Sequence, residues 1–374
     1  MPENKRSTVL IVAPVPPPMH GAAYATQLLL DSGFCGEFDV LHIDARYVNK
    51  VSELSGFSAG KVFKMLGYLW KTFVTILRRR VDVVILEPAF YAGPFVKDAC
   101  FILMCRLLPV KTVAWFHMNF TAMEFNKLSG MQRWFIVRML NMLDHGVCVG
   151  RKLIDGLPAQ LDRRKLAFIH NGIPPLEHPD PEANKKARSK VRVMYLSNMG
   201  RTKGWHVLLQ AARQVRRVNS NVEFHFYGNP MADSPIEEIR EEFAASGGGD
   251  AIVYHGPVYG QDKNEAFLAA DIFCFPSMYP PEAFPLTILE AMNAGLSIVT
   301  TDVGAVAEAL DGEEGGAVVP QNDPNALAAA ILALADDPQQ RQNQGRYNRA
   351  RFFEHFTSEA FARRWTEFVR GVVD

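Results

Sequence analysis

Short runs of β-branched and aliphatic residues alternate with longer stretches of helical periodicity along nearly the whole chain. This alternation is typical of parallel sheets covered by helices, because neighbouring parallel strands need a crossover connection. The predicted strands of the first half are residues 8–13, 39–43, 81–86, 112–116, 146–149 and 166–169. The alternation then restarts, with strands predicted at residues 191–196, 222–227, 252–255, 272–276, 297–300 and 316–319. The pattern therefore predicts an α/β fold with two sheets.

A proline-rich segment separates the two sets of strands. Residues 174–181 read PPLEHPDP, and proline both lacks a backbone N–H and fixes φ, so this segment continues neither sheet. A chain of 374 residues is also long enough for two hydrophobic cores. We expect an N-terminal domain of residues 1–178 and a C-terminal domain of residues 179–351.

The net charge of zero hides an asymmetry between the halves. Up to His178 the chain has 21 Lys and Arg against 14 Asp and Glu, and the remainder has 19 against 26. A basic first half favours an anionic partner, either a membrane surface or a phosphate-bearing substrate. Nucleic acid is not expected, because the basic residues are not interleaved with aromatic residues on a strand pattern.

The five cysteines are scattered and have neither metal-ligand nor redox-pair spacing, so we interpret them as buried reduced thiols. The polar first residues run directly into an apolar strand, without the pattern of a signal peptide. Both features favour a reducing cytoplasm, with localisation at the inner face of the cell membrane as a further hypothesis.

Residues 61–80 combine an apolar helical face with lysines and a final triple arginine. One interpretation is a helix that lies in the headgroup plane of an anionic bilayer; the other is a core-facing helix with a solvated basic face. Residues 98–108 and 131–143 are similarly apolar. None of the three reaches the ~20 uninterrupted apolar residues that span a membrane, so no spanning segment is predicted.

The densest chemical signal lies at residues 275–295, FPSMYPPEAFPLTILEAMNAG. A strand ends at Pro276, a loop presents Glu282, and a helix with Glu290 begins near Pro285. Free amides at a helix N-terminus bind anions, so we expect Phe284, Pro285, Leu286 and Thr287 to hold a diphosphate through backbone donors. The two carboxylates then reach a sugar hydroxyl and a ribose hydroxyl.

This run resembles the retaining glycosyltransferases of family four, whose mark is a pair of glutamates separated by seven residues. Glu282 and Glu290 match that pair, and Phe284, Leu286 and Gly295 match the residues around it. The resemblance covers nearly the whole chain. It implies the GT-B fold, in which two Rossmann-like domains face each other across a cleft, and a nucleoside-diphosphate sugar as donor. It also implies that the C-terminal segment 352–374 packs back onto the first domain.

A second stretch that resembles the family is residues 195–204, YLSNMGRTKG. Family members carry an arginine and, five residues later, a lysine, which both neutralise the donor diphosphate. Lys203 keeps its place, whereas Asn198 stands at the arginine position and Arg201 lies nearby on the same loop. Cations placed there stabilise the charge that grows on the leaving diphosphate. The resemblance thus assigns Lys203 a catalytic role, and leaves open whether Asn198 or Arg201 supplies the other donor contact.

Three further sites match the family in the first domain. The loop of residues 14–23, before a helix expected at 24–30, carries Gly21 and Ala22 where family members place paired small residues against the donor phosphate and the acceptor. His117 ends a strand and matches the histidine placed against the transferred sugar. Residues 170–173, HNGI, match a turn that we interpret as architectural.

The predicted reaction is transfer of a hexose-type sugar to a hydroxyl of a glycan or lipid-linked acceptor, with retention, in cell-surface polysaccharide biosynthesis. The resemblance implies His117, Glu282 and Lys203 as catalytic residues and no metal or other cofactor, and the chain has no Asp-x-Asp donor motif. Two alternatives stay open. A nucleotide-sugar epimerase shares the fold and the donor site, and a non-catalytic scaffold at the membrane surface would explain the basic segment but not the glutamates.

Overall fold

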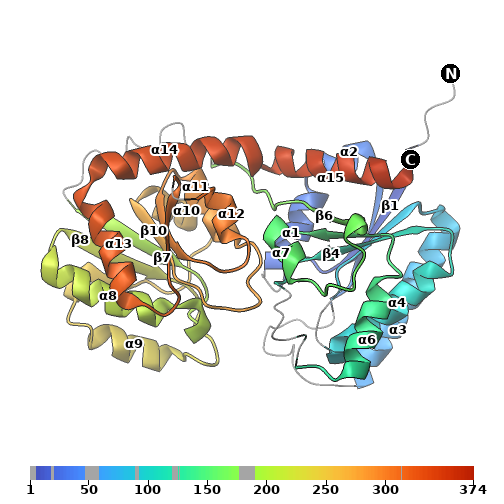
Figure 1. Ribbon diagram of the computed structural model, residues 1–374, viewed down its shortest axis with the longest axis horizontal. Coiled ribbons are helices and arrows are strands. Elements are labelled where there is room, and N and C mark those ends of the chain that lie inside the picture. The colour runs from blue at the N-terminus through green and yellow to red at the C-terminus, as the bar shows by residue number, and fades with distance from the viewer. Residues whose placement is uncertain are drawn as a thin grey trace. The chain divides into compact units, whose positions relative to one another are not determined.

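The computed structural model describes residues 6–17, 21–46, 59–88, 92–119, 125, 127–176, 190–312 and 314–374. The chain forms two compact units, each with its own sheet and helices (Figure 1). Unit 1 comprises the chain up to Gly172 together with Ser358–Asp374, and unit 2 comprises Ile173–Thr357. The boundary expected after residue 178 and the last part of the expected hinge, residues 177–181, lie outside the described residues.

Unit 1 is built on a six-stranded parallel sheet in the order β2-β1-β3-β4-β5-β6. Its strands are β1 (Thr8–Ala13), β2 (Asp39–Asp44), β3 (Val83–Leu86), β4 (Lys111–Phe116), β5 (His145–Cys148) and β6 (Leu166–Phe168). Its helices are α1 (Gly21–Leu30), α2 (Phe34–Glu37), α3 (Ala59–Arg79), α4 (Ala92–Arg106), α6 (Gly130–Leu140), α7 (Arg151–Gly156) and α15 (Ser358–Val373).

Unit 2 has a second six-stranded parallel sheet, in the order β12-β11-β10-β7-β8-β9. Its strands are β7 (Val191–Leu196), β8 (Val222–Tyr227), β9 (Ile252–Tyr254), β10 (Ile272–Phe275), β11 (Ser297–Thr301) and β12 (Gly316–Val319). Its helices are α8 (Trp205–Val218), α9 (Ile236–Ala244), α10 (Gly260–Leu268), α11 (Leu286–Asn293), α12 (Val306–Leu310), α13 (Pro324–Asp336) and α14 (Pro338–His355).

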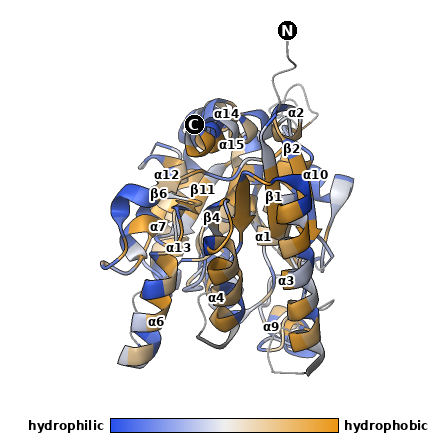
Figure 2. Cartoon of the chain, turned by 90° about the vertical axis from the view of Figure 1, so that its right-hand side faces the viewer, coloured by the Kyte–Doolittle hydropathy of each residue, from blue (hydrophilic) through white to orange (hydrophobic). Residues whose placement is uncertain are grey.

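The α/β class and the two parallel sheets predicted from the alternation are confirmed, and all twelve predicted strands are present within two residues of their expected bounds. Strands such as β1, β3 and β10 are recognisable because all their residues are buried, so they consist almost entirely of apolar residues. All six residues of β1 are buried, and Figure 2 shows this strand in the orange of hydrophobic residues. Among the described helices, none is both long and apolar enough to cross a membrane.

The strand order of unit 2 indicates where a ligand is expected to bind. From β7 the chain first adds β8 and β9 on one side of the sheet and then β10, β11 and β12 on the other, so the direction reverses between β7 and β10. In sheets of this kind the loops that leave the two strands at the reversal diverge, and ligands bind in the crevice outside their carboxyl ends. The segments that follow Leu196 of β7 and Phe275 of β10 are therefore the expected binding segments of unit 2.

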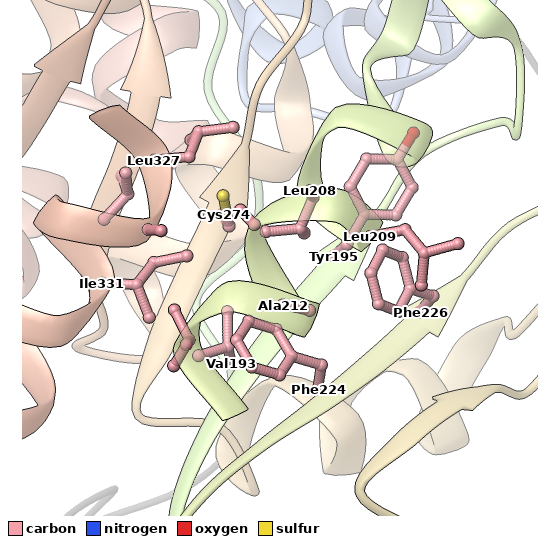
Figure 3. Packing of buried hydrophobic residues seen from close by; sticks show 14 of the residues in the cluster. Val193, Tyr195, Leu208, Leu209, Ala212, Phe224, Phe226, Cys274, Leu327 and Ile331 are labelled. Atoms are coloured by element: carbon pink, nitrogen blue, oxygen red, sulfur yellow. The ribbon is translucent and has the colours of Figure 1, made fainter. Parts of the chain in front are cut away.

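One hydrophobic cluster of unit 2 lies between its sheet and the helices α8 and α13. Figure 3 shows Leu208 and Ala212 of α8 and Ile331 of α13 among strand residues such as Phe224 and Cys274, and all of these side chains are buried. Trp205, at the first position of α8, is completely buried and stacks on Phe243 at a centroid distance of 6.0 Å. The five cysteines are free thiols, of which Cys105, Cys148 and Cys274 are buried and the other two are half-buried.

The C-terminal segment divides differently from the expected 352–374. Residues up to Thr357 belong to unit 2, where Phe352 is fully buried near the end of α14. Helix α15 belongs to unit 1, and its Trp365 meets Trp115 of β4 edge to face at 4.8 Å. Both indole rings are completely buried, so the last helix of the chain completes the core of unit 1.

Candidate functional site

The turn between β10 and α11 presents an open helix end. Helix α11 begins at Leu286 after Pro285, and within the described residues no side chain caps it. The Thr287 hydroxyl in its first turn is buried and has no partner there either. Uncapped amides and the helix dipole favour an anion at this position. One detail of the prediction is corrected: Pro285 has no N–H and donates nothing, so Leu286 and Thr287 supply the donors of the first turn.

The loop before α11 is held in a single shape by small contacts. Ser277 is fully buried, and its hydroxyl lies 3.3 Å from Oε2 of Glu282. Behind the loop, Gly304 has φ of +55°, and a Cβ there would lie 2.5 Å from the carbonyl oxygen of Glu282. Only glycine allows this close approach. Glu282 is thus fixed by the backbone that surrounds it.

The loop after β7 lies directly against this turn. Gly204 has φ of +78°, and a Cβ at this residue would lie 2.0 Å from the carbonyl oxygen of Pro276. The amide of Met278 donates to the carbonyl of Thr202 at 2.8 Å. These contacts join the carboxyl ends of β7 and β10, which are the two strands at the reversal of the sheet.

Lys203 and Glu282 form an ion pair at this junction. Nζ of Lys203 lies 2.5 Å from Oε2 of Glu282, and the side chains are only 16% and 12% exposed. The ammonium also lies 4.3 Å from the centroid of the Tyr279 ring. A cation and a carboxylate separated by 79 residues in the sequence therefore occupy one point beside the open end of α11.

Glu290, one helical turn further, forms a second ion pair. Its Oε1 lies 2.5 Å from Nζ of Lys263 on α10. Burial raises the pKa of Glu290 above its usual range, and the charge and hydrogen bond of Lys263 oppose this rise. Sequence reasoning missed Lys263, because this lysine lies on an amphipathic helix with no motif around it. Ser277 and Tyr279 lie inside the quoted motif, but the motif alone gives them no role.

The two candidates for the second donor contact differ in their surroundings. The Arg201 guanidinium binds the carboxylates of Glu238 and Glu242 on α9, at 2.8 Å for the latter, and lies over the ring of Trp205. These contacts count against Arg201 as a ligand of the donor diphosphate. Asn198 is exposed and only its backbone carbonyl has a hydrogen bond, from the Tyr195 hydroxyl. Both assignments stay predictions.

Phe284 contributes its backbone to the site, and its ring packs in the core. Its side chain is 6% exposed and packs against Phe356 at 5.8 Å. The ring therefore anchors the start of α11 in the core of unit 2. A donor molecule can meet only the backbone of this residue.

The remaining predicted residues belong to unit 1. Gly21 and Ala22 were expected in a loop, but α1 begins at Gly21 and both residues form its first turn. The expectation was wrong because small residues without a clear N-cap left the helix start unmarked. His117 directly follows β4, half-buried, with its ring 4.2 Å from that of Trp115.

Unit 1 also contains a carboxyl group that sequence reasoning missed. Glu87 directly follows β3, and β1 and β3 flank the point where the strand order of this sheet reverses. Burial raises the pKa of Glu87 to about 7, while Lys97 lowers it and Asp98 raises it further. Its Oε2 has no hydrogen-bond partner among the described residues. A glutamate after a strand, without a motif, gives no sequence signal.

No three His, Cys, Asp or Glu side chains gather as metal ligands in the part of the chain that the structure describes. The site is instead built from cations, hydroxyls and helix amides. Metal independence stays a prediction.

Comparison with known proteins shows what the chain is similar to. Residues 190–337 match the family model described as Glycosyl transferases group 1. A D-inositol 3-phosphate glycosyltransferase of Paenarthrobacter aurescens is 27% identical over 52% of this chain and 48% of its own length. A phosphatidyl-myo-inositol mannosyltransferase of Mycolicibacterium smegmatis is 28% identical over 53% of the chain and 51% of its length. The chain thus spans about half the length of these curated relatives.

The fold extends the similarity over the whole chain. The crystal structure of Anabaena Alr3699/HepE in complex with UDP superposes with a TM-score of 0.75, at 16% sequence identity, over 97% of this chain and all of that one. The resemblance to family four that the glutamate motif suggested is confirmed by the family model and the named relatives. The chain therefore has the GT-B fold, and its residues 190–337 are similar to the Glycosyl transferases group 1 family.

Proposed function

We propose that this protein transfers a hexose-type sugar from a nucleoside-diphosphate sugar to a hydroxyl of a glycan or lipid-linked acceptor. The observation that carries the proposal is the uncapped start of α11, with two Lys–Glu pairs beside it, at the strand reversal of unit 2. An enzyme that releases a diphosphate needs fixed positive charge where negative charge develops, and Lys203 and the α11 amides provide it.

When the donor binds, it takes up contacts with side chains that are paired with one another in this structure. As a diphosphate binds to the α11 amides, it competes with Glu282 for Lys203. The released carboxylate then accepts a hydrogen bond from a hydroxyl of the transferred sugar. Glu290, held by Lys263, accepts the ribose hydroxyls in the same way. In both cases a buried carboxylate keeps a hydrogen-bond donor throughout, which avoids an unpaired buried charge.

We further propose that the anomeric configuration is retained, by attack on the same face within an ion pair, with the leaving phosphate accepting the acceptor proton. His117, Gly21 and Ala22 keep their proposed roles at the transferred sugar and the donor phosphate. No metal is required in this proposal, because Lys203 and the helix amides carry the charge compensation.

The comparisons support the substrate classes. HepE of Anabaena binds UDP, which favours a uridine or related nucleotide donor. The inositol-containing acceptors in the names of the two curated relatives favour a polar hydroxyl acceptor, in one case on a lipid. With the basic helix α3, this supports a peripheral protein at the cytoplasmic face of a membrane, active in polysaccharide assembly.

The proposal is tested by titrating the protein with UDP, GDP, ADP and their glucose, mannose and N-acetylglucosamine derivatives, with thermal shift and calorimetry as readouts. One nucleotide series should bind with a saturable isotherm, with and without EDTA. The matching sugar nucleotide, incubated with extracted glycans and lipids, should give a product whose anomeric configuration NMR reads.

Two outcomes would contradict the proposal. Epimerised free sugar nucleotide in the absence of any acceptor would mark an epimerase. If no nucleotide bound with a saturable isotherm, the protein would lack a donor site, and the non-catalytic scaffold would be the better interpretation.

A further inference from the structure

Helix α3 of unit 1 has two opposite apolar faces, and within the described residues one of them packs on the core while the other is exposed. Thr72 and Ile76 are buried on the first face. On the other face Phe63 is 74% exposed and Trp70 is 67% exposed, and Leu66 and Leu77 lie on the same stripe. Side chains of this size are rarely left in water as a continuous stripe without a binding function. Neither sequence interpretation alone describes this helix, because it both packs on the core and exposes an apolar face.

The exposed stripe continues over two neighbouring helices. Helix α3 packs against α4, and α4 packs against α6; in Figure 2 the three helices form a row. Leu107, directly after α4, is 86% exposed, and Met131 and Trp134 of α6 are 78% and 66% exposed. In the described part of unit 1, all the large hydrophobic side chains that are exposed lie on this row or next to it. We call it the three-helix surface, with the members Phe63, Leu66, Trp70, Leu77, Val96, Leu103, Leu107, Met131 and Trp134.

The charges beside these side chains are almost all positive. Lys64, Lys71 and Arg78 recur every seven residues along α3, next to the apolar stripe. Neither α3 nor α6 contains an Asp or Glu, and the single acid of α4, Asp98, is buried and paired with Lys97. An apolar face bordered by cations matches the headgroup region of an anionic bilayer, where the apolar side chains enter and the cations meet lipid phosphates.

A groove at one end of this surface has the properties of a headgroup site. It has a volume of about 650 Å³ and lies between α6 and residues 155–160, and none of the predicted site residues lines it. Arg133, Trp134 and Arg138 line one wall, and Asp155 is the acid among the lining residues. Within the described residues neither guanidinium has a hydrogen bond or an ion pair.

We propose that the three-helix surface docks on an anionic bilayer and that the groove beside α6 binds the phosphate headgroup of one phospholipid. Arg133 and Arg138 bind the phosphate, and Trp134 lies at the level of the glycerol backbone, where an indole ring is favourable. The inference deepens the proposed function, since it names the surface through which the transferase reaches a lipid-linked acceptor.

Intrinsic fluorescence offers a direct test. Of the five tryptophans, Trp115, Trp205 and Trp365 are completely buried, whereas Trp70 and Trp134 are exposed, and both lie on the three-helix surface. Vesicles of phosphatidylcholine and phosphatidylglycerol should therefore shift the emission to the blue and protect it from acrylamide. The double variant Trp70→Phe/Trp134→Phe should lose this response. A response that persists in the double variant would overturn the proposal.

Flotation with the same vesicles tests the groove. Each cation near an anionic surface contributes ~1 kcal/mol to the free energy of membrane binding. The double variant Arg133→Ala/Arg138→Ala should therefore lower the partition coefficient by roughly 10–30-fold. The matched control is Arg217→Ala/Val218→Ser, which removes one exposed cation and one exposed apolar side chain from α8 of unit 2 and should bind like wild type. Vesicles of phosphatidylcholine alone should bind weakly, and soluble glycerol phosphate should compete poorly.

Equal vesicle binding by the groove variant and its control would refute the groove, and equal binding to neutral vesicles would refute the anionic surface. Strong competition by glycerol phosphate would reassign the groove to a soluble phosphate ligand. The nucleotide-induced thermal shift, measured on the same variants, should stay at its wild-type value. If the wild-type protein showed no nucleotide-induced thermal shift, the proposed sugar transfer would be contradicted. The result on vesicle binding would still hold, because it does not depend on the nucleotide.

Discussion

Both units are built on a parallel sheet, but they differ in where their paired charges and their exposed hydrophobic side chains lie. Unit 2 pairs its buried charges: Lys203 with Glu282, and Lys263 with Glu290. Its exposed large hydrophobic side chains are scattered over separate elements. Unit 1 gathers such side chains on three adjacent helices, and burial raises the pKa of its Glu87. The same kind of sheet thus carries two different surfaces, one with paired charges, which we propose for a small anionic ligand, and one apolar and basic, which we propose for a membrane.

The strongest test of this contrast removes a site cation of unit 2. Lys203→Ala should lower kcat by about 10²–10³-fold, because the leaving diphosphate loses its fixed positive charge. Glu282→Ala should have a similar effect through the transferred sugar, and both variants should keep their far-ultraviolet circular dichroism. Lys190→Ala, in the same unit with a half-exposed side chain, should retain wild-type rates. Wild-type rates in both site variants would reject the site assignment.

A pair of tryptophan substitutions tests whether the units are separate in stability. Trp365→Ala should destabilise unit 1 and Trp205→Ala unit 2, by about 3–5 kcal/mol each, because each indole is completely buried. Hydrogen exchange resolved by peptide should show faster exchange mainly in the unit that carries the substitution. Equal acceleration in both units by either variant would show that the chain unfolds as one cooperative body.

Opposite pKa shifts predict opposite pH responses. Burial raises the pKa of Glu87 to about 7 from its usual 4.5, so unit 1 loses stability as the pH rises between these values, by about 3 kcal/mol. In unit 2 burial also disfavours charged Glu223, but the hydrogen bond and charge of Arg192 outweigh burial and lower its pKa. Unit 2 therefore loses this contribution as the pH falls below 4.5.

Glu87→Gln should make unit 1 more stable at pH 8 and leave it nearly unchanged at pH 4, whereas Glu223→Gln should destabilise unit 2 near neutral pH. Thermal unfolding at a series of pH values measures both. An unchanged pH profile in Glu87→Gln would show that this carboxyl does not titrate in the expected window.

The smallest expected effect concerns helix caps. Ser129 caps α6 in a reciprocal arrangement with Gln132, and Asp323 caps α13 by accepting from the amides of Asn325 and Ala326. Substitution of either cap by Ala should cost about 1 kcal/mol. Because α13 packs into the core of unit 2 and α6 lies in the exposed row, Asp323→Ala should have the larger effect on chemical denaturation. The reverse order would show that α6 is more firmly held than its exposure indicates.

The sequence was informative where burial is complete. The strands whose residues are all buried, such as β1 and β10, leave an uninterrupted apolar signature, and the alternation of strand and helix patterns placed the others. The β10–α11 turn was found because Glu282, Glu290 and Gly295 occupy fixed positions in one short segment. The start of α1 was missed at Gly21, since small residues without a cap give no boundary signal.

Contacts between different helices and loops were much harder to predict from the sequence. Lys263 reaches Glu290 from another helix, and Arg201 pairs with Glu238 and Glu242 of α9. Such pairings depend on which elements become neighbours, and a local pattern does not encode this. The exposed side of α3 was equally ambiguous, because an apolar stripe has the same periodicity whether it meets a core or water.

Because α15 belongs to unit 1, the two units become complete at different times during synthesis. Trp115 acquires its partner Trp365 only after the last helix has left the ribosome, whereas every residue of unit 2 has been synthesised by Thr357. During translation the second unit is therefore complete before the first. Until α15 is synthesised, nascent unit 1 lacks the indole of Trp365 that packs on Trp115.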